Sequence, residues 1–199
     1  MGFDFEKQSR RPLVRKIIIG IIIWAIEIAA VIFFAYIIVY YALEKTEMVG
    51  ISMESTLKDS EKVLINKFTY RYNDPKRFDV IVFKQKGKEH SYYDIKRIIG
   101  LPGEVVQVKD GQIYINNEVV EDIVTVDTMN NYGLADEPIL LEKNEYFVLG
   151  DNRNNSEDSR FASVGMIQRD EIIGQAFIRL SPFNFVDKLN LTKNKETKE

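Results

Sequence analysis

One long apolar segment dominates the hydropathy pattern near the start of the chain. Residues 17–43 are apolar apart from Gly20 and Glu27. As an α-helix, roughly the first 23 of them would span about 35 Å, which is enough to cross a bilayer. The apolar core of a cleaved signal peptide is shorter, at roughly 7–15 residues. The pattern therefore predicts an uncleaved transmembrane anchor over residues 17–43.

Glu27 interrupts this anchor well inside its apolar stretch. An ionised carboxylate at that depth costs about 2.5 kcal/mol or more. The residue is therefore either a neutral acid within a very hydrophobic helix or a group that faces another helix. The sequence is compatible with both interpretations.

Beyond the anchor, the pattern changes to short apolar runs typical of β-strands. Residues 63–65, 80–83, 145–149 and 177–180 are such runs, and Asp110-Gly111 is a signal for a two-residue hairpin. Helical periodicity does not recur over any long stretch. We expect a mainly β fold: one N-terminal transmembrane helix followed by a β-rich domain over residues 44–187, of which about 105–145 form a less regular subdomain. Residues 188–199 are strongly charged and predict a disordered tail.

The charge distribution predicts how the chain crosses the membrane. Residues 1–16 carry five Lys or Arg against two acidic residues, whereas residues 42–199 carry 22 basic and 27 acidic residues. Because basic flanks stay on the cytoplasmic side, we expect residues 1–16 in the cytoplasm and the domain after the anchor on the extracytoplasmic face. The net charge of −3, without a basic cluster, argues against a nucleic-acid partner. The chain has no cysteine, so its stability does not depend on disulfides.

Ser52 is the candidate nucleophile, and it follows the apolar segment by nine residues. That link limits Ser52 to about 30 Å from the membrane. A serine hydroxyl needs a neighbouring base to attack a carbonyl at neutral pH. The single histidine, His90, would be the base of a Ser-His-Asp triad, but it lies in a segment rich in Lys and Glu that is typical of a solvated loop.

Lys96 is the other candidate base. It lies among apolar and aromatic residues in 92–103, a predicted strand that ends in a Pro-Gly turn. A lysine acts as a base only when burial lowers its pKa from about 10.4 toward neutrality. The alternative is an edge-strand lysine that prevents aggregation, which is the commoner role of a lysine in a strand.

Four sequence blocks, in this order, resemble the motifs of bacterial type I signal peptidases. They are GISMESTL at 50–57, RFDVIVF at 77–83, KRIIGLPGE at 96–104 and GDNRNNSEDSR at 150–160. The resemblance extends from the membrane segment to about Pro182. It implies a catalytic dyad of Ser52 and Lys96. It also implies that Ser156 helps to hold the lysine, and that a polar network supports the dyad through Asp151, Asp158, Arg160 and Arg97.

Two positions depart from the family pattern. Ser55 stands where the family usually has proline, so we expect a less rigid turn after the nucleophile. Gly50 stands where some members supply a serine hydroxyl to the oxyanion hole, which leaves the backbone N–H of Ser52 as the expected main donor. The resemblance also implies small substrate side chains before the cleaved bond, and Val49 and Ile95 are the apolar candidates for that pocket.

The leading hypothesis is a membrane-bound serine endopeptidase that cleaves N-terminal signal peptides from secretory preproteins by a Ser-Lys dyad, without a cofactor. Its expected partners are the preproteins and the lipid bilayer, while its oligomeric state stays open. One alternative is a catalytically silent, membrane-tethered β domain that binds peptides, and another is a self-cleaving Ser-Lys protease. The oxygen-rich loop 151–160 could also bind calcium, but it lacks the ligand spacing of an EF-hand, so a polar network is the preferred interpretation.

Overall fold

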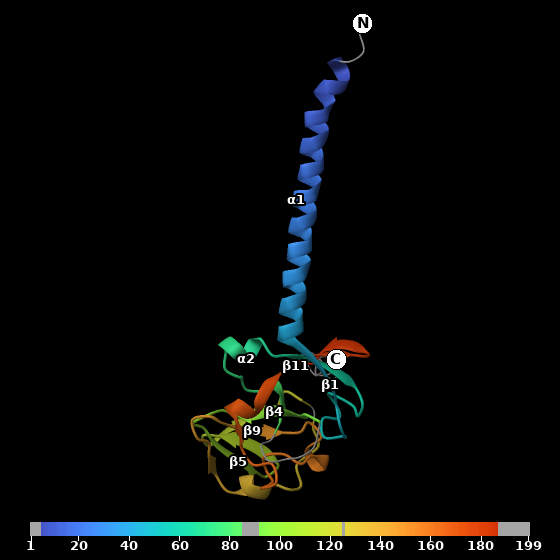
Figure 1. Ribbon diagram of the computed structural model, residues 1–199. Helices are drawn as coiled ribbons and strands as arrows, with labels where there is room; N and C mark the ends of the chain where they lie inside the picture. Colours follow the sequence, from blue (N-terminus) through green and yellow to red (C-terminus); the bar gives the residue numbers. More distant parts are fainter. Residues whose placement is uncertain (1–4, 85–91, 125, 187–199) are drawn as a thin grey trace, which may run out of the picture. The chain divides into compact units, whose positions relative to one another are not determined.

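The computed structural model describes residues 5–84, 92–124 and 126–186, and it divides the chain into two compact units, residues 1–42 and 43–199. The first unit is the helix α1, Phe5–Ala42, which Figure 1 shows as one uninterrupted helix. Its stretch Leu13–Ala42 is the one helix among the described residues that is long and apolar enough to cross a membrane. A helix satisfies all its backbone hydrogen bonds internally, as lipid requires. The helix thus begins upstream of the predicted anchor and ends at Ala42.

The second unit is built mainly from β-strands, which confirms the predicted fold class. Its larger sheet has the strand order β1-β2-β11-β3-β4-β9-β10, and β12 pairs with β11. All neighbouring strands in this sheet are antiparallel. The strands are β1 Leu43–Glu47, β2 Lys62–Asn66, β3 Val80–Phe83, β4 Asp94–Gly100, β9 Glu145–Leu149, β10 Ile167–Gln168, β11 Ile172–Leu180 and β12 Phe183–Phe185.

A smaller sheet of four antiparallel strands has the order β7-β6-β5-β8. Its strands are β5 Val105–Lys109, β6 Gln112–Ile115, β7 Glu118–Val120 and β8 Ile139–Leu140. The predicted hairpin at Asp110-Gly111 is confirmed, because Lys109 pairs with Gln112 and both turn residues have positive φ, at 53° and 75°. Both residue types tolerate the left-handed backbone that such a turn requires.

Short helices complete the second unit. They are the α-helix α2, Thr69–Tyr72, and the 3₁₀ helices η1 Gly133–Asp136, η2 Arg153–Asn155 and η3 Arg169–Glu171. The helix η2 lies within the predicted polar loop 151–160, so that loop contains a single tight turn of helix.

The core explains why the strands of the larger sheet are apolar without interruption. In β3, Val80 and Val82 join one buried cluster, whereas Ile81 and Phe83 join another. Successive side chains of a strand point to opposite faces, so β3 is buried on both faces of the sheet. The first cluster also contains Met53 and Leu57, which anchors the segment around Ser52 in the core.

Candidate active site

The segment before Ser52 is held by an extension of the β1–β2 ladder. Beyond the last strand pair, the Met48 N–H donates to the Glu61 carbonyl at 2.9 Å, and the Ser60 N–H donates to the Met48 carbonyl at 2.9 Å. At the next step, the Asp59 carboxylate accepts the Gly50 N–H at 2.6 Å. A side-chain carboxylate thus replaces a backbone carbonyl, and Gly50 adopts φ +81°, a conformation that favours glycine.

The segment after Ser52 forms a hydrogen-bonded turn. The N–H groups of Thr56 and Leu57 both donate to the Met53 carbonyl, at 2.9 and 2.7 Å. Ser55 within this turn has φ +86°, which the ring of a proline excludes. The turn therefore differs in backbone conformation from any turn that carries proline at position 55, and the buried side chains of Met53 and Leu57 hold it in place.

Lys96 lies on β4, which pairs with β3 on one side and β9 on the other. The alternative of an edge-strand lysine is therefore wrong. The lysine is only 6% exposed, and its Nζ lies 2.7 Å from Ser52 Oγ, to which it donates a hydrogen bond. Burial in a protein interior disfavours the charged ammonium relative to the neutral amine.

Tyr93 lies three residues before Lys96 and hydrogen-bonds through its hydroxyl to the Glu44 carboxylate at 3.0 Å. Burial raises the pKa of the Tyr93 phenol above its usual value, and the hydrogen bond to Glu44 and the charge of Glu44 raise it further. Tyr93 therefore stays protonated to a higher pH than an exposed tyrosine.

Gly150 allows two functional segments to approach closely. A Cβ built at Gly150 would lie 2.1 Å from Ser156 Oγ and 2.5 Å from the Ser52 carbonyl oxygen, so a larger residue would collide with both. Ser156 thus lies beside the backbone of the Ser52 segment. Its buried Oγ has no hydrogen-bond partner among the described residues, so the expected hydrogen bond to Lys96 is not formed in this structure.

Arg97 and Asp151 form a buried ion pair beside the dyad. The Arg97 Nε and Nη2 atoms donate to the two Asp151 oxygens at 2.8 and 2.6 Å, while Nη1 donates to the Phe78 carbonyl at 2.8 Å. The Thr56 hydroxyl donates to the same carboxylate. Thr56 belongs to the first motif block, but its role depends on a long-range contact that no sequence pattern predicts.

Asp158 and Arg160 form a second buried pair within the loop 150–160. Arg160 donates to both Asp158 oxygens, at 2.8 and 2.9 Å, and to the Arg153 carbonyl at 2.5 Å. Asp158 also accepts the Gly150 N–H at 3.1 Å. The described residues contain no group of three His, Cys, Asp or Glu side chains that could hold a metal ion, and both Asp151 and Asp158 are engaged by arginines.

Asn152 is a contact residue that the sequence interpretation missed. Its N–H donates to the Ser52 carbonyl at 3.0 Å, and its Nδ2 donates to the Ile51 carbonyl at 3.1 Å. The Ser52 N–H donates to no acceptor within the part of the chain that the structure describes. The two carbonyls around the nucleophile are thus held by Asn152, while the N–H that is expected to serve the oxyanion is available.

The predicted pocket residues occupy different environments. Val49 is half exposed, whereas Ile95 is buried in the first core cluster. Ile51, next to Ser52, is also half exposed and was not predicted to line the pocket. His90 lies outside the described residues.

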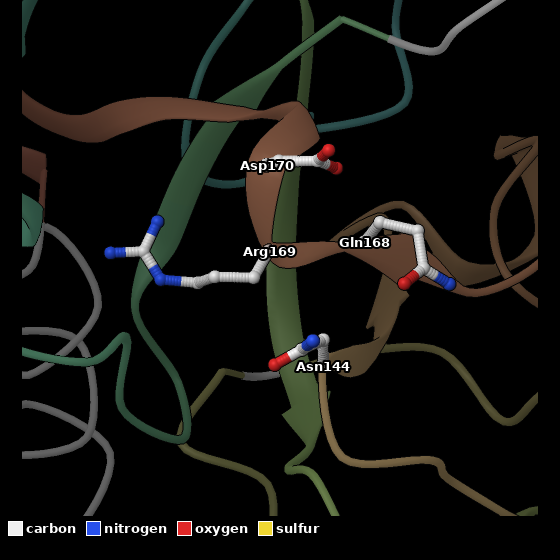
Figure 2. A pocket seen from close by; sticks show the side chains of 4 residues that line it. All are labelled: Asn144, Gln168, Arg169 and Asp170. Atoms are coloured by element: carbon white, nitrogen blue, oxygen red, sulfur yellow. The ribbon is translucent and has the colours of Figure 1, made fainter.

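Another hollow, of about 500 Å³, is lined by none of the predicted site residues (Figure 2). It is lined by Asn144, Gln168, Arg169 and Asp170, whose side chains point in different directions rather than toward one point. Arg169 is engaged elsewhere, because it donates to the Tyr70 carbonyl. The hollow therefore lacks the converging groups of an active site.

The comparisons with known proteins agree with the motif blocks. The model of the family described as "Signal peptidase, peptidase S26" matches residues 21–181. Signal peptidase I of Bacillus amyloliquefaciens is 34% identical over 195 residues, which cover 94% of this chain and 99% of the relative. Signal peptidase I P of Bacillus subtilis subsp. natto is 35% identical, over 85% of this chain and 93% of the relative. A crystal structure of a signal peptidase I from Enterococcus faecalis V583 covers 52% of this chain and 97% of its own, with 32% identity and a TM-score of 0.41.

The chain therefore belongs to the signal peptidase family, peptidase S26, and the predicted family is confirmed. Together with the N-terminal apolar helix, this membership makes the chain a membrane-anchored peptidase.

Met53→Ala tests whether the core holds the nucleophile segment in place. Removing a buried methionine side chain costs about 2–5 kcal/mol of unfolding free energy. Met129→Ala is the matched control, because Met129 is also buried but belongs to the second core cluster, which includes residues of the smaller sheet. We expect urea unfolding to show similar losses for both variants. Only Met53→Ala should also lower the rate of preprotein cleavage at a temperature where both variants are folded. Equal cleavage rates of the two variants would show that Met53 does not hold the nucleophile segment in place.

Asp59→Ala tests the carboxylate that accepts the Gly50 N–H. Loss of one hydrogen bond of about 0.5–1.5 kcal/mol should lower kcat by about 2- to 10-fold, because the oxyanion donor at Ser52 becomes less well ordered. Asp59→Asn keeps an acceptor oxygen and should retain most of the rate. Lys58→Ala, an exposed neighbour, is the control. If steady-state kinetics show that Asp59→Asn is as slow as Asp59→Ala, the lost hydrogen bond is excluded as the cause of the lower kcat.

Proposed function

We propose that this chain removes N-terminal signal peptides from exported preproteins, with Ser52 as the nucleophile and Lys96 as the general base. The observation that carries the proposal is the 2.7 Å contact between Lys96 Nζ and Ser52 Oγ in a member of the signal peptidase family. When the amine is neutral, the same contact lets the Ser52 hydroxyl donate its proton to Nζ. This distance is within the range that general-base catalysis needs.

The reaction proceeds through an acyl-enzyme. Ser52 Oγ attacks the scissile carbonyl carbon while Lys96 takes the hydroxyl proton, and the Ser52 N–H stabilises the oxyanion that forms. The C–N bond then breaks, and Lys96 returns the proton to the leaving amine. Lys96 next takes a proton from water, which attacks the ester, and Ser52 recovers its proton as the signal peptide is released. No step needs a metal or a cofactor.

The positioning residues in this proposal are Ser156, Arg97, Asp151, Asp158 and Arg160. Arg97 follows Lys96 in β4, and its ion pair with Asp151 connects that strand to the loop that carries Gly150. Within the same loop, the Asp158 carboxylate accepts the Gly150 N–H and pairs with Arg160. Ser156 is proposed to orient the lysine amine when the substrate is bound, and its position beside Gly150 and the Ser52 segment supports this role.

Val49 and Ile51 offer apolar side chains to the substrate on either side of Gly50. An extended peptide that runs along this segment would place its small side chains against them, as in the binding of a peptide along a sheet edge. Ile95 is buried in the core, so its side chain is not exposed to the substrate.

Lys96→Arg is the decisive variant for the dyad. It keeps a positive charge at position 96, but an arginine does not release its proton in a protein. We expect the cleavage rate of a preprotein to fall by about 10²- to 10⁴-fold, as far as for Lys96→Ala. A Lys96→Arg rate near that of the unchanged protein would remove Lys96 as the general base and leave the family membership intact.

The pH profile separates Lys96 from its neighbour Tyr93. The rate should rise with pH as the amine of Lys96 loses its proton. Because burial and Glu44 raise the pKa of Tyr93, its phenol stays neutral over that range and contributes no limb to the profile. Tyr93→Phe is therefore the control, and this variant should show the same rise of rate with pH. If the rise is lost in Tyr93→Phe, it reports the titration of the tyrosine and not of Lys96.

We further propose that the N-terminus lies in the cytoplasm and the unit 43–199 outside, as the basic flank before the anchor favours. Protease added to intact spheroplasts should digest the second unit and leave a short N-terminal fragment protected. Detection by a tag at each end distinguishes the fragments. Protection of the whole second unit until the cells are lysed would reverse the orientation.

A further inference from the structure

Glu27 occupies the middle of the membrane-spanning stretch of α1. The stretch Leu13–Ala42 has 30 residues, and Glu27 is the fifteenth of them. Between Lys16 and Ala42 it is the one charged residue. Among the described residues of the unit that contains α1 there is no second helix to supply a partner for the carboxyl. Ionisable groups at the centre of a bilayer commonly pair with a group on another helix.

The helix surface is hollowed beside Glu27. A hollow of about 270 Å³ is lined by Trp24, Glu27, Ile28, Val31 and Ile32. The first four are spaced i, i+3, i+4 and i+7. This is the four-residue hole into which a side chain of a second helix inserts when two helices pack as a coiled coil.

The hole belongs to a longer seam along the helix. The seam advances by alternating steps of four and three residues, which is the repeat of two helices in a left-handed pair. Gly20, the one glycine of the anchor, lies one heptad before Glu27, so the small residue and the acid share the same position of the repeat. Small residues let helices in lipid approach closely. The seam residues are Gly20, Trp24, Glu27, Val31, Phe34, Ile38 and Tyr41.

We infer that α1 pairs in the membrane with α1 of a second copy of this chain, in parallel and in register, with Glu27 opposite Glu27. Two copies enter the membrane in the same orientation, so their Glu27 side chains lie at the same depth. A parallel pair with two-fold symmetry brings identical positions together. A protonated carboxyl has both a donor and an acceptor, so two such groups satisfy each other without any further residue.

A second copy is favoured over a different membrane protein because it supplies the matching group from residues already present. The inference rests on the membrane anchoring of α1 and is independent of the dyad.

The absence of cysteine in the natural chain permits a direct test with introduced cysteines. The full-length protein carries either Val31→Cys on the seam or Ala29→Cys on the opposite face at nearly the same depth. Each variant is placed in phosphatidylcholine vesicles at a high lipid-to-protein ratio and oxidised. We expect a disulfide-linked dimer with Val31→Cys, at several-fold higher yield than with Ala29→Cys. Equal yields at the two positions would overturn the inference.

Substitution of Glu27 then tests the carboxyl itself in the Val31→Cys background. Glu27→Leu should lower the yield of cross-linked dimer several-fold, whereas Glu27→Gln, whose amide donates and accepts, should keep it. Cleavage of a preprotein by each variant shows that the second unit is folded. An unchanged yield with Glu27→Leu overturns the pairing. The pairing is also overturned if the chain is monomeric in vesicles but cross-links to another protein in native membranes.

Discussion

The buried ion pair between Arg97 and Asp151 is the interaction on which the rest of the site depends. It joins the strand that carries Lys96 to the loop that follows β9, and the Thr56 hydroxyl adds the segment that carries Ser52. Burying two charges is costly unless their remaining hydrogen bonds are satisfied. Here the carboxylate accepts from both Arg97 and Thr56, and Arg97 also donates to the Phe78 carbonyl. Removal of one partner would strand a charge in the interior.

The segment around Ser52 is held from two directions by different kinds of force. Met53 and Leu57 pack into the apolar core, whereas Asn152 and Asp59 bind backbone groups on either side of the nucleophile. Gly150 allows this arrangement, because any side chain there would collide with Ser156 and with the Ser52 carbonyl. A nucleophile held in this way loses little conformational entropy when the substrate binds, which is the basis of preorganised catalysis.

The membrane helix and the peptidase unit pose separate physical problems. The second unit is stabilised by buried apolar clusters and satisfied polar pairs. The membrane-spanning stretch of the helix is apolar around its circumference, and Glu27 and Gly20 lie on one face of it. Polar and small residues are the features that give helices specific contacts in lipid, where apolar side chains gain little from meeting each other.

The sequence by itself determined what depends on local pattern: the apolar anchor, the β character of the second unit, the hairpin at Asp110-Gly111, and the motif blocks that contain Ser52 and Lys96. Only the tertiary structure decided which of these residues meet. Lys96 and Ser52 are 44 positions apart, and their contact depends on the pairing of β4 between β3 and β9. The same register buries Ile95, excludes an edge position for Lys96, and brings Asn152 and Thr56 to the site. Strand order and register arise from long-range packing, which the period of a single strand does not encode.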